Sequence, residues 1–191
     1  MKPVTRCSWA NSSDIERDYH DIEWGVPLHD DRGLFEFLIL EGAQAGLSWR
    51  TVLAKRERYR EVFHQFDIAS VAGMKGSELE KLLLDPGIIR NRLKISAARD
   101  NALASLKVIE EFGSLDAYLW SFVGGKPVLN GWSDRGQVPA STPLSDRMSK
   151  DLKKRGFRFV GTTICYAFMQ ATGMVNDHIA TCFRHKASAG K

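Results

Sequence analysis

The sequence predicts an all-α fold, and two patterns carry that prediction. Apolar residues recur at helical spacing along most of the chain, and no segment shows the sustained two-residue alternation of a half-buried strand. Residue types that start and stop helices separate the apolar segments. With 191 residues, 43% of them hydrophobic, the chain can bury one sizeable core. We expect a single helical domain over residues 1–184 and a disordered tail over 185–191.

The first third of the chain predicts a buried helix followed by an amphipathic segment. Residues 34–40 are apolar nearly all round, which is typical of a central helix. Gly42 and Gly46 are expected to interrupt this helix. From 49 to 63, apolar residues again recur at helical spacing, with the charged run 55–58 between them.

The middle of the chain carries recognisable helix starts and ends. Ser77 and Glu80 have the spacing of a capping box ahead of three leucines. The Asp-Pro-Gly sequence at 85–87 ends that helix. A longer helix is expected from Lys94 toward Glu111.

The last third predicts a loop between helices. Ser114 has the residue type of a helix cap, and the Gly-, Pro-, Ser- and Asn-rich stretch 124–143 predicts a long surface loop. A helix is expected over 145–156, ending at a glycine. A final pair of helices is expected over 162–172 and from about Asp177.

The charge balance allows a polyanionic partner without requiring one. The formal net charge is +4, and lysines and arginines that neutralise phosphates release condensed counterions. An ordinary, mildly basic soluble protein has the same balance.

Composition also limits where the protein works. No apolar run approaches the ~20 residues that a membrane helix needs, and the N-terminal residues lack the apolar core of a secretory signal. We expect a cytoplasmic protein with no membrane partner, associated with the nucleoid if the source is bacterial. The chain has three cysteines, which favours metal or core roles over a disulfide framework.

Cysteine and histidine residues near both chain ends form a first candidate site. His178 and Cys182 are four residues apart, so on a helix they share one face and supply half of a tetrahedral zinc site. Cys7 and His20 are candidates for the other half. The alternative is that these four residues are scattered singly, since the spacing from Cys7 to His20 matches no common zinc finger.

Glu41 and several aromatic residues form a second candidate site. A carboxylate directly after an apolar helix is partly buried, which is costly unless a cationic ligand or another partner compensates the charge. Trp9, Tyr19, Trp24 and Trp49 offer flat faces that can hold a cationic ring. The alternative is a helix-end glutamate bonded to backbone amides, with the tryptophans filling the core.

The connection over residues 155–163 is a third candidate. It is basic and interrupted by glycines, which let a backbone approach phosphate closely, and the amides that open the next helix can bind an anion. The alternative is an ordinary helix connection with a solvated basic face.

The chain carries long and unusual sequence blocks at 19–27 (YHDIEWGVP), 40–49 (LEGAQAGLSW), 87–95 (GIIRNRLKI), 153–166 and 175–178. These blocks, in their order and over nearly the whole chain, resemble the 3-methyladenine DNA glycosylase I family, called Tag, of the helix-hairpin-helix glycosylase superfamily. The resemblance implies an all-α, helix-hairpin-helix fold. It also implies a monofunctional hydrolase that excises 3-methyladenine from DNA in base excision repair and has no lyase activity.

The resemblance also assigns roles to residues. It implies one structural Zn²⁺ per chain, held by Cys7, His20, His178 and Cys182, and a base pocket built by Glu41, Tyr19 and Trp49. It implies that the connection 156–161 grips the DNA backbone, so the expected DNA-binding residues are Arg155, Gly156, Gly161, Thr162 and Thr163.

Two positions depart from the expected patterns. Glu16 stands where the family carries a second aromatic residue, so one wall of the pocket is expected to differ. Asn176 stands where the wider superfamily places its catalytic aspartate, but the Tag family shares this asparagine.

These residues suggest a mechanism in which the damaged base is extruded from the duplex. Leu47, in the 45–47 turn, is our candidate to fill the gap. Trp49 and Tyr19 would stack on the cationic base, while Trp9, Trp24 and Glu16 complete the walls. Glu41 is the one carboxylate we expect in the pocket and the candidate catalytic residue, with recognition a better match than proton abstraction.

The expected partners follow from this mechanism. They are alkylated double-stranded DNA and free 3-methyladenine as product, and we expect a monomer. A zinc-stapled helical module that binds DNA without cleaving the base bond is the competing interpretation.

Overall fold

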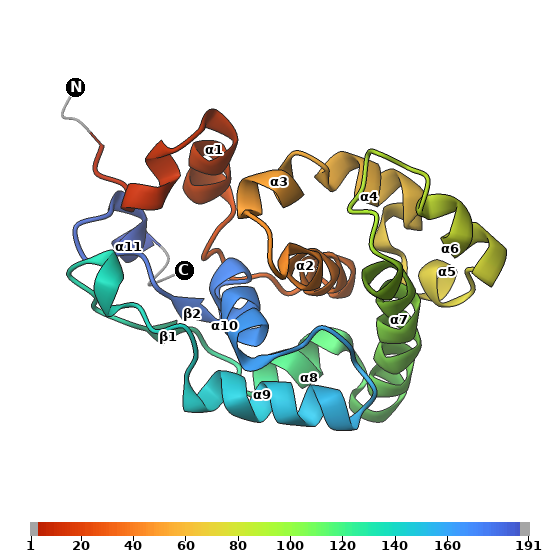
Figure 1. Cartoon of the computed structure of the whole chain (residues 1–191). Coiled ribbons are helices and arrows are strands. Elements are labelled where there is room, and N and C mark those ends of the chain that lie inside the picture. Colours follow the sequence, from red (N-terminus) through yellow and green to blue (C-terminus); the bar gives the residue numbers. More distant parts are fainter. Residues whose placement is uncertain (1–3, 188–191) are drawn as a thin grey trace.

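The computed structural model describes residues 4–187 and confirms that helices dominate the fold (Figure 1). In chain order the helices are α1 (Asp14–Ile22), α2 (Asp31–Gln44), α3 (Trp49–Leu53), α4 (Arg56–Val62), α5 (Ile68–Ala72), α6 (Gly76–Leu82), α7 (Arg92–Phe112), α8 (Leu115–Ser121), α9 (Pro143–Lys154), α10 (Thr162–Ala171) and α11 (Phe183–Ala187). The described residues also contain the 3₁₀ turns η1 (Ser8–Asn11), η2 (His64–Phe66) and η3 (Arg135–Gln137). One short parallel strand pair, β1 (Val128–Leu129) with β2 (Val175–Asn176), was not expected.

Helix α2 is the centre of the molecule, as predicted. Every residue from 34 to 43 is buried, and α3, α7, α8 and α10 pack around the helix (Figure 1). Burial of each large apolar side chain contributes roughly 1.5–3 kcal/mol, so this helix anchors the core. At its start, the Asp31 carboxylate accepts hydrogen bonds from the backbone N–H groups of Leu115 and Asp116, which fixes the first turn of α8.

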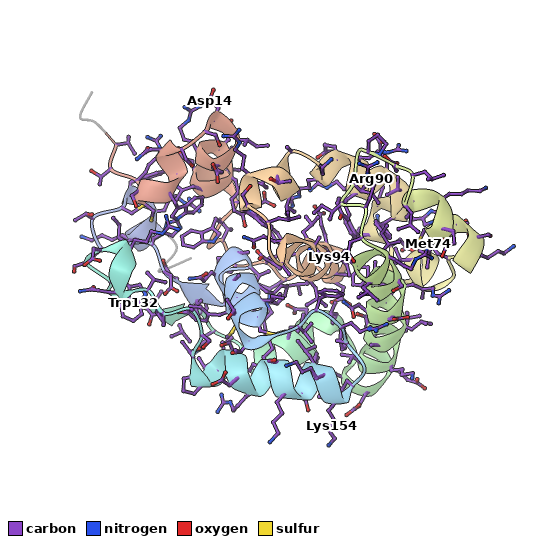
Figure 2. The ribbon with its side chains drawn as sticks, in the orientation of Figure 1. Asp14, Met74, Arg90, Lys94, Trp132 and Lys154 are labelled. Atoms are coloured by element: carbon purple, nitrogen blue, oxygen red, sulfur yellow. The ribbon has the colours of Figure 1, made fainter. Side chains whose placement is uncertain are left out.

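The predicted interruption of α2 at Gly42 is wrong, because the helix continues to Gln44. A side chain at position 42 would meet the Phe159 Cβ at 3.1 Å, so glycine allows the connection after α9 to pack directly on the helix. Lys94, labelled beside α2 in Figure 2, donates hydrogen bonds from Nζ to the carbonyl oxygens of Ala43 (2.8 Å) and Ala45 (2.7 Å). These bonds satisfy carbonyl groups that the helix end leaves free.

The predicted helix cap at Ser114 is confirmed, whereas the predicted start of α6 is displaced. The Ser114 side chain accepts a hydrogen bond from the Ala117 N–H, as expected of a cap. The capping box expected at Ser77 and Glu80 is wrong, since α6 begins at Gly76 and the Glu78 carboxylate accepts the Lys75 N–H instead.

The last predicted helix is also corrected. Residues 177–182 follow β2 without helical structure, and α11 begins only at Phe183. The expected disordered tail overlaps α11 at residues 185–187, and its remainder, 188–191, lies outside the described residues. The predicted loop 124–143 is largely irregular but contains β1 and η3.

The two ends of the described chain meet on one side of the molecule (Figure 1). The Phe183 N–H donates to the Thr5 carbonyl oxygen at 3.0 Å. The strand pair lies next to this contact and brings the end of α10 beside residues 128–130. Within residues 4–187, no helix is both long enough and apolar enough to cross a membrane.

Gly173, just after α10, provides a test of this packing. It has a φ of +72°, and an added Cβ would lie 2.5 Å from backbone atoms of Val26 and Pro27. Gly113 has a similar φ of +88° but open space around it. Gly113→Ala should therefore cost only the backbone strain of ~1–2 kcal/mol. Gly173→Ala should lower the free energy of unfolding by more than ~3 kcal/mol, because backbone must move. Urea unfolding of both variants tests this, and equal losses would contradict the close approach.

Candidate active site

The structure brings together the four predicted metal ligands from both chain ends. Cys7 precedes η1, His20 lies in the last turn of α1, His178 follows β2, and Cys182 lies in the turn before α11. All four are buried, and one ligand atom from each lies within 4.8 Å of the others. The premise that His178 and Cys182 share a helix face is wrong, because a non-helical turn places them.

The distances in this cluster suit a tetrahedral ion. Cys182 Sγ lies 3.4 Å from His20 Nε2 and 3.6 Å from His178 Nδ1, and Cys7 Sγ lies 3.6 Å from His178 Nδ1. Ideal zinc–sulfur and zinc–nitrogen bonds at the tetrahedral angle give a sulfur–nitrogen edge of about 3.6 Å. Hydrogen bonding with Cys7, and then with the two imidazoles, lowers the pKa of the Cys182 thiol. The residues therefore fit a metal ion.

The second nitrogen of each imidazole is held by another group. His20 Nδ1 lies 2.8 Å from Asp21 Oδ1, and Asp21 in turn accepts hydrogen bonds from Arg6. His178 Nε2 lies 3.1 Å from the Trp24 carbonyl oxygen. Such outer contacts set the ring orientation and tautomer that a metal ligand needs.

A pocket of about 410 Å³ lies directly beside this cluster. Its walls include every residue that the sequence suggested for a base site: Trp9, Glu16, Tyr19, Trp24, Glu41 and Trp49. The pocket is also lined by residues that were not predicted for it, namely Cys7 of the metal-ligand cluster, Ser8, Gln44, Arg135, Val138, Pro139, Ala167, Gln170, Asp177 and Ile179.

Glu41 supplies a desolvated carboxyl group to the pocket. It lies within the last turns of α2, not after the helix end as expected, and is 4% exposed. Burial raises its pKa from an ordinary 4.5 to about 8. No hydrogen bond from residues 4–187 reaches its carboxyl oxygens, which argues against a glutamate satisfied by backbone amides.

The aromatic side chains form a connected wall around this carboxyl group. The Tyr19 ring lies 5.4 Å from Trp49 and 6.3 Å from Trp9, and Trp9 meets Trp24 edge-on at 5.1 Å. Tyr19 Oη and Trp49 Nε1 are buried without a hydrogen-bond partner among the described residues. Because buried polar atoms are rarely left unpaired, these two point to a ligand or ordered water.

Glu16 forms part of the rim. Its carboxylate accepts hydrogen bonds from the hydroxyls of Ser12 (2.6 Å) and Ser13 (2.7 Å), so it is held in place although partly exposed. The expectation that Glu41 is the one carboxylate in the pocket is therefore wrong, because Glu16 and Asp177 also line it. Leu47 is exposed in the turn after α2, where Gly46 adopts a φ of +80°.

Asp177 is the most connected acid in the pocket wall. It is 2% exposed and accepts hydrogen bonds from Asn130, Trp132, Tyr166 and Gln170 at 2.6–2.8 Å. Sequence reasoning missed this residue, because nothing in the local sequence around it marks it as part of a pocket wall. Asn176 is buried beside it, and its side chain bonds to the backbone of His185 and His178 and not to the pocket.

The connection between α9 and α10 is clamped from α7 and α9. The Asn101 side chain accepts the Arg158 N–H at 2.7 Å and donates to the Arg158 carbonyl oxygen at 3.1 Å. Ser149 Oγ donates to the Val160 carbonyl oxygen at 2.6 Å. Gly156 has a φ of +92°, as expected of a glycine that ends a helix.

The start of α10 remains open at its backbone. Gly161 is the residue before the helix, and no side chain caps its first turn. The Thr162 hydroxyl donates to Asp146 at 2.6 Å, whereas Thr163 is exposed. The helix therefore presents free amides that suit an anion.

Arg155 does not lie free for a phosphate. Its guanidinium donates to Glu111 at 2.6 Å and to Asp151 at 2.8 Å, and it lies 4.9 Å from the Phe112 ring centre. A phosphate contact would require breaking these pairs. In this structure the charge of Arg155 holds the end of α9, and its expected contact with DNA stays a prediction.

Comparisons with known proteins agree with this geometry. Residues 9–185 match a family model described as methyladenine glycosylase. The chain is 51% identical over 179 residues to DNA-3-methyladenine glycosylase 1 of Escherichia coli (strain K12), covering 94% of this chain and 96% of the relative. A crystal structure of a 3-methyladenine DNA glycosylase I matches with a TM-score of 0.90 at 53% identity, covering 94% and 98%. A variant of such an enzyme, crystallised in complex with 3-methyladenine, matches with a TM-score of 0.91 at 34% identity, covering 97% and 98%.

The raised pKa of Glu41 predicts how its removal changes stability with pH. A carboxyl group whose folded-state pKa lies above the unfolded value contributes stability below pH ~4.5 that is lost as the pH rises through about 8. The stability of Glu41→Gln relative to the parent protein should therefore increase by at least about 1.4 kcal/mol as the pH rises from 5 to 8.5. Urea unfolding across this range measures the difference, with the exposed Glu110→Gln as control. A difference that does not vary with pH would contradict a desolvated Glu41.

Proposed function

The chain belongs to the methyladenine glycosylase family and is a hydrolase that removes 3-methyladenine from alkylated DNA, and we propose that it holds the extruded base against Glu41. One observation carries the proposal: a buried carboxyl group without partners stands among aromatic rings, next to the unpaired Tyr19 Oη and Trp49 Nε1. A methylated purine satisfies all three groups at once. Extrusion from the duplex costs a few kcal/mol of unstacking, which these contacts would offset.

Charge explains the preference for the damaged base. Methylation at N3 gives adenine a positive charge, and stacking on Tyr19 and Trp49 stabilises that charge. Glu41 in its ionised form accepts hydrogen bonds from the N6 edge and complements the cation. Normal adenine is neutral and leaves the desolvated carboxyl group poorly compensated, so it binds weakly.

Once the methylated base is bound in the pocket, hydrolysis needs little further help from the protein. A water oxygen bonds to the anomeric carbon as the bond from that carbon to the base nitrogen breaks. The bonding electron pair goes to the base and neutralises it, and the water releases its proton to solvent. We assign no general base. Glu41 remains the proposed catalytic residue through its contact with the departing base.

The connection over residues 156–161 is the proposed grip on the DNA backbone, in the manner of a helix-hairpin-helix motif. Its support comes from the open amides at the start of α10 and from the close approach that Gly156 and Gly161 allow. Thr163 is exposed at the same end. Leu47, exposed beside Gln44 of the pocket wall, is the proposed residue that fills the gap left by the base.

Zn²⁺ is the proposed occupant of the Cys7, His20, His178 and Cys182 cluster. Two thiolates neutralise the charge of the ion, and four protein ligands leave no position for substrate. When bound, the ion supplies a cross-link between segments more than 150 residues apart, which restricts the unfolded chain. Its role is therefore structural.

The reaction should stop at an abasic site. Lyase chemistry requires an amine that attacks the sugar, and no lysine lines the pocket in the described part of the chain. Incubation with a methylated duplex should release free 3-methyladenine, detected by chromatography, with strand breaks only after alkali. Glu41→Gln should release the base more slowly while binding undamaged duplex as the parent does. A borohydride-trapped enzyme–DNA adduct would contradict this mechanism, and binding of damaged DNA without release would favour the binding-module interpretation.

Zinc content and stability should fall together in a ligand variant. We expect elemental analysis to find one zinc per chain. Cys182→Ser should lose the metal and lower the melting temperature by several degrees, because metal binding contributes directly to folding. Cys165→Ser is the matched control, since Cys165 is equally buried but lies outside the cluster. Full stability of a zinc-free protein would overturn the structural role.

A further inference from the structure

Arg135 is the single cation among the described residues that line the pocket, whose other charged side chains are the acids Glu16, Glu41 and Asp177. It is solvent-exposed, which places it at the rim and not on the floor. Within residues 4–187 its guanidinium makes no ion pair or side-chain hydrogen bond. By contrast, Arg56 and Arg155 are paired with carboxylates. The guanidinium of Arg135 is therefore available to a ligand.

The segment that carries Arg135 is held by its own hydrogen bonds. The Asp134 carboxylate accepts the Gly136 N–H at 2.7 Å, which starts η3. Across the turn, the Ser133 N–H donates to Gln137 Oε1 at 2.8 Å. These bonds fix the backbone from which Arg135 projects, so only its side chain has to be ordered on binding.

The same segment is anchored to the pocket wall. Trp132, labelled in Figure 2, donates from Nε1 to Asp177 at 2.7 Å, and its carbonyl oxygen accepts the Ala180 N–H at 2.8 Å. Asn130 also donates to Asp177, at 2.6 Å. The segment that carries Arg135 is therefore positioned by the pocket wall and is not a free surface loop.

The charge of the substrate explains why a cation belongs at this rim. An extruded nucleotide stays attached to two phosphates, which remain outside while the base enters. The acids that suit a cationic base repel these phosphates, and the repulsion is strong where solvent is partly excluded. A guanidinium fork matches the geometry of a phosphate and removes that repulsion.

We propose that Arg135 binds a DNA backbone phosphate adjacent to the extruded nucleotide, a contact that rests on the proposed base pocket. Arg135 thus orients the sugar at the mouth while Glu41 holds the base. This contact recognises a phosphate group of the DNA backbone and therefore does not depend on the base sequence.

The test compares Arg135→Ala with Lys126→Ala, which removes an equal charge from an exposed position outside the pocket. Binding to a duplex with a stable abasic-site analogue is measured over a range of salt concentrations. Arg135→Ala should weaken binding roughly tenfold and reduce the salt-dependence slope by about 0.9, the value for one phosphate. Lys126→Ala should change both only slightly, and Arg135→Lys should recover part of the slope.

Two further measurements separate this contact from other roles. The affinity for free 3-methyladenine, measured by tryptophan fluorescence, should be the same in Arg135→Ala as in the parent. The rate of base release from a methylated duplex should fall. Equal effects of Arg135→Ala and Lys126→Ala on duplex binding would overturn the proposal, as would a matching loss of free-base affinity. If the parent releases no base while the salt slope still changes at Arg135, the proposed function fails and the phosphate contact stands.

Discussion

The burial of residues 34–43 of α2 is the constraint on which the rest of the structure depends. Ten consecutive residues of this helix are shielded from solvent, so any ionisable group among them loses its hydration. Glu41 is such a group, and it lines the pocket while remaining 4% exposed. The fold thus maintains a carboxyl group whose charged form is unfavourable until a cation arrives. On the proposed mechanism, selectivity for a cationic base therefore depends on a residue of the core and not on a flexible surface loop.

The converging chain ends build the walls around that carboxyl group. Each of three metal-ligand candidates has a pocket residue as a close sequence neighbour: Trp9 lies two positions after Cys7, Tyr19 directly precedes His20, and Asp177 directly precedes His178. Holding the ligands together therefore also sets the spacing of the walls. Trp24 joins the two features, because its ring packs edge-on against His178 at 4.6 Å while it lines the pocket.

The proposed DNA grip is coupled to the same central helix. Phe159 packs on Gly42, the residue after Glu41, and Asn101 of α7 holds the backbone of Arg158 from the other side. The connection is consequently positioned by the core, although its glycines would allow it to move. Arg155 belongs to this support, since its charge is used by Glu111 and Asp151.

Local patterns in the sequence were enough to predict the helices around residues 34–40 and 94–111, the Ser114 cap and the glycine at 156, because short-range hydrogen bonds and apolar periodicity determine them. The sequence blocks likewise identified the family, and sequence reasoning as a whole named six residues that line the pocket. Only the tertiary structure decided which distant segments meet there: Asp177 and Arg135 carry no local sign of their place in a wall, and the turn that presents His178 and Cys182 is not helical. The physical reason is that such contacts join residues far apart in the chain, and their geometry depends on packing that no short stretch of sequence contains.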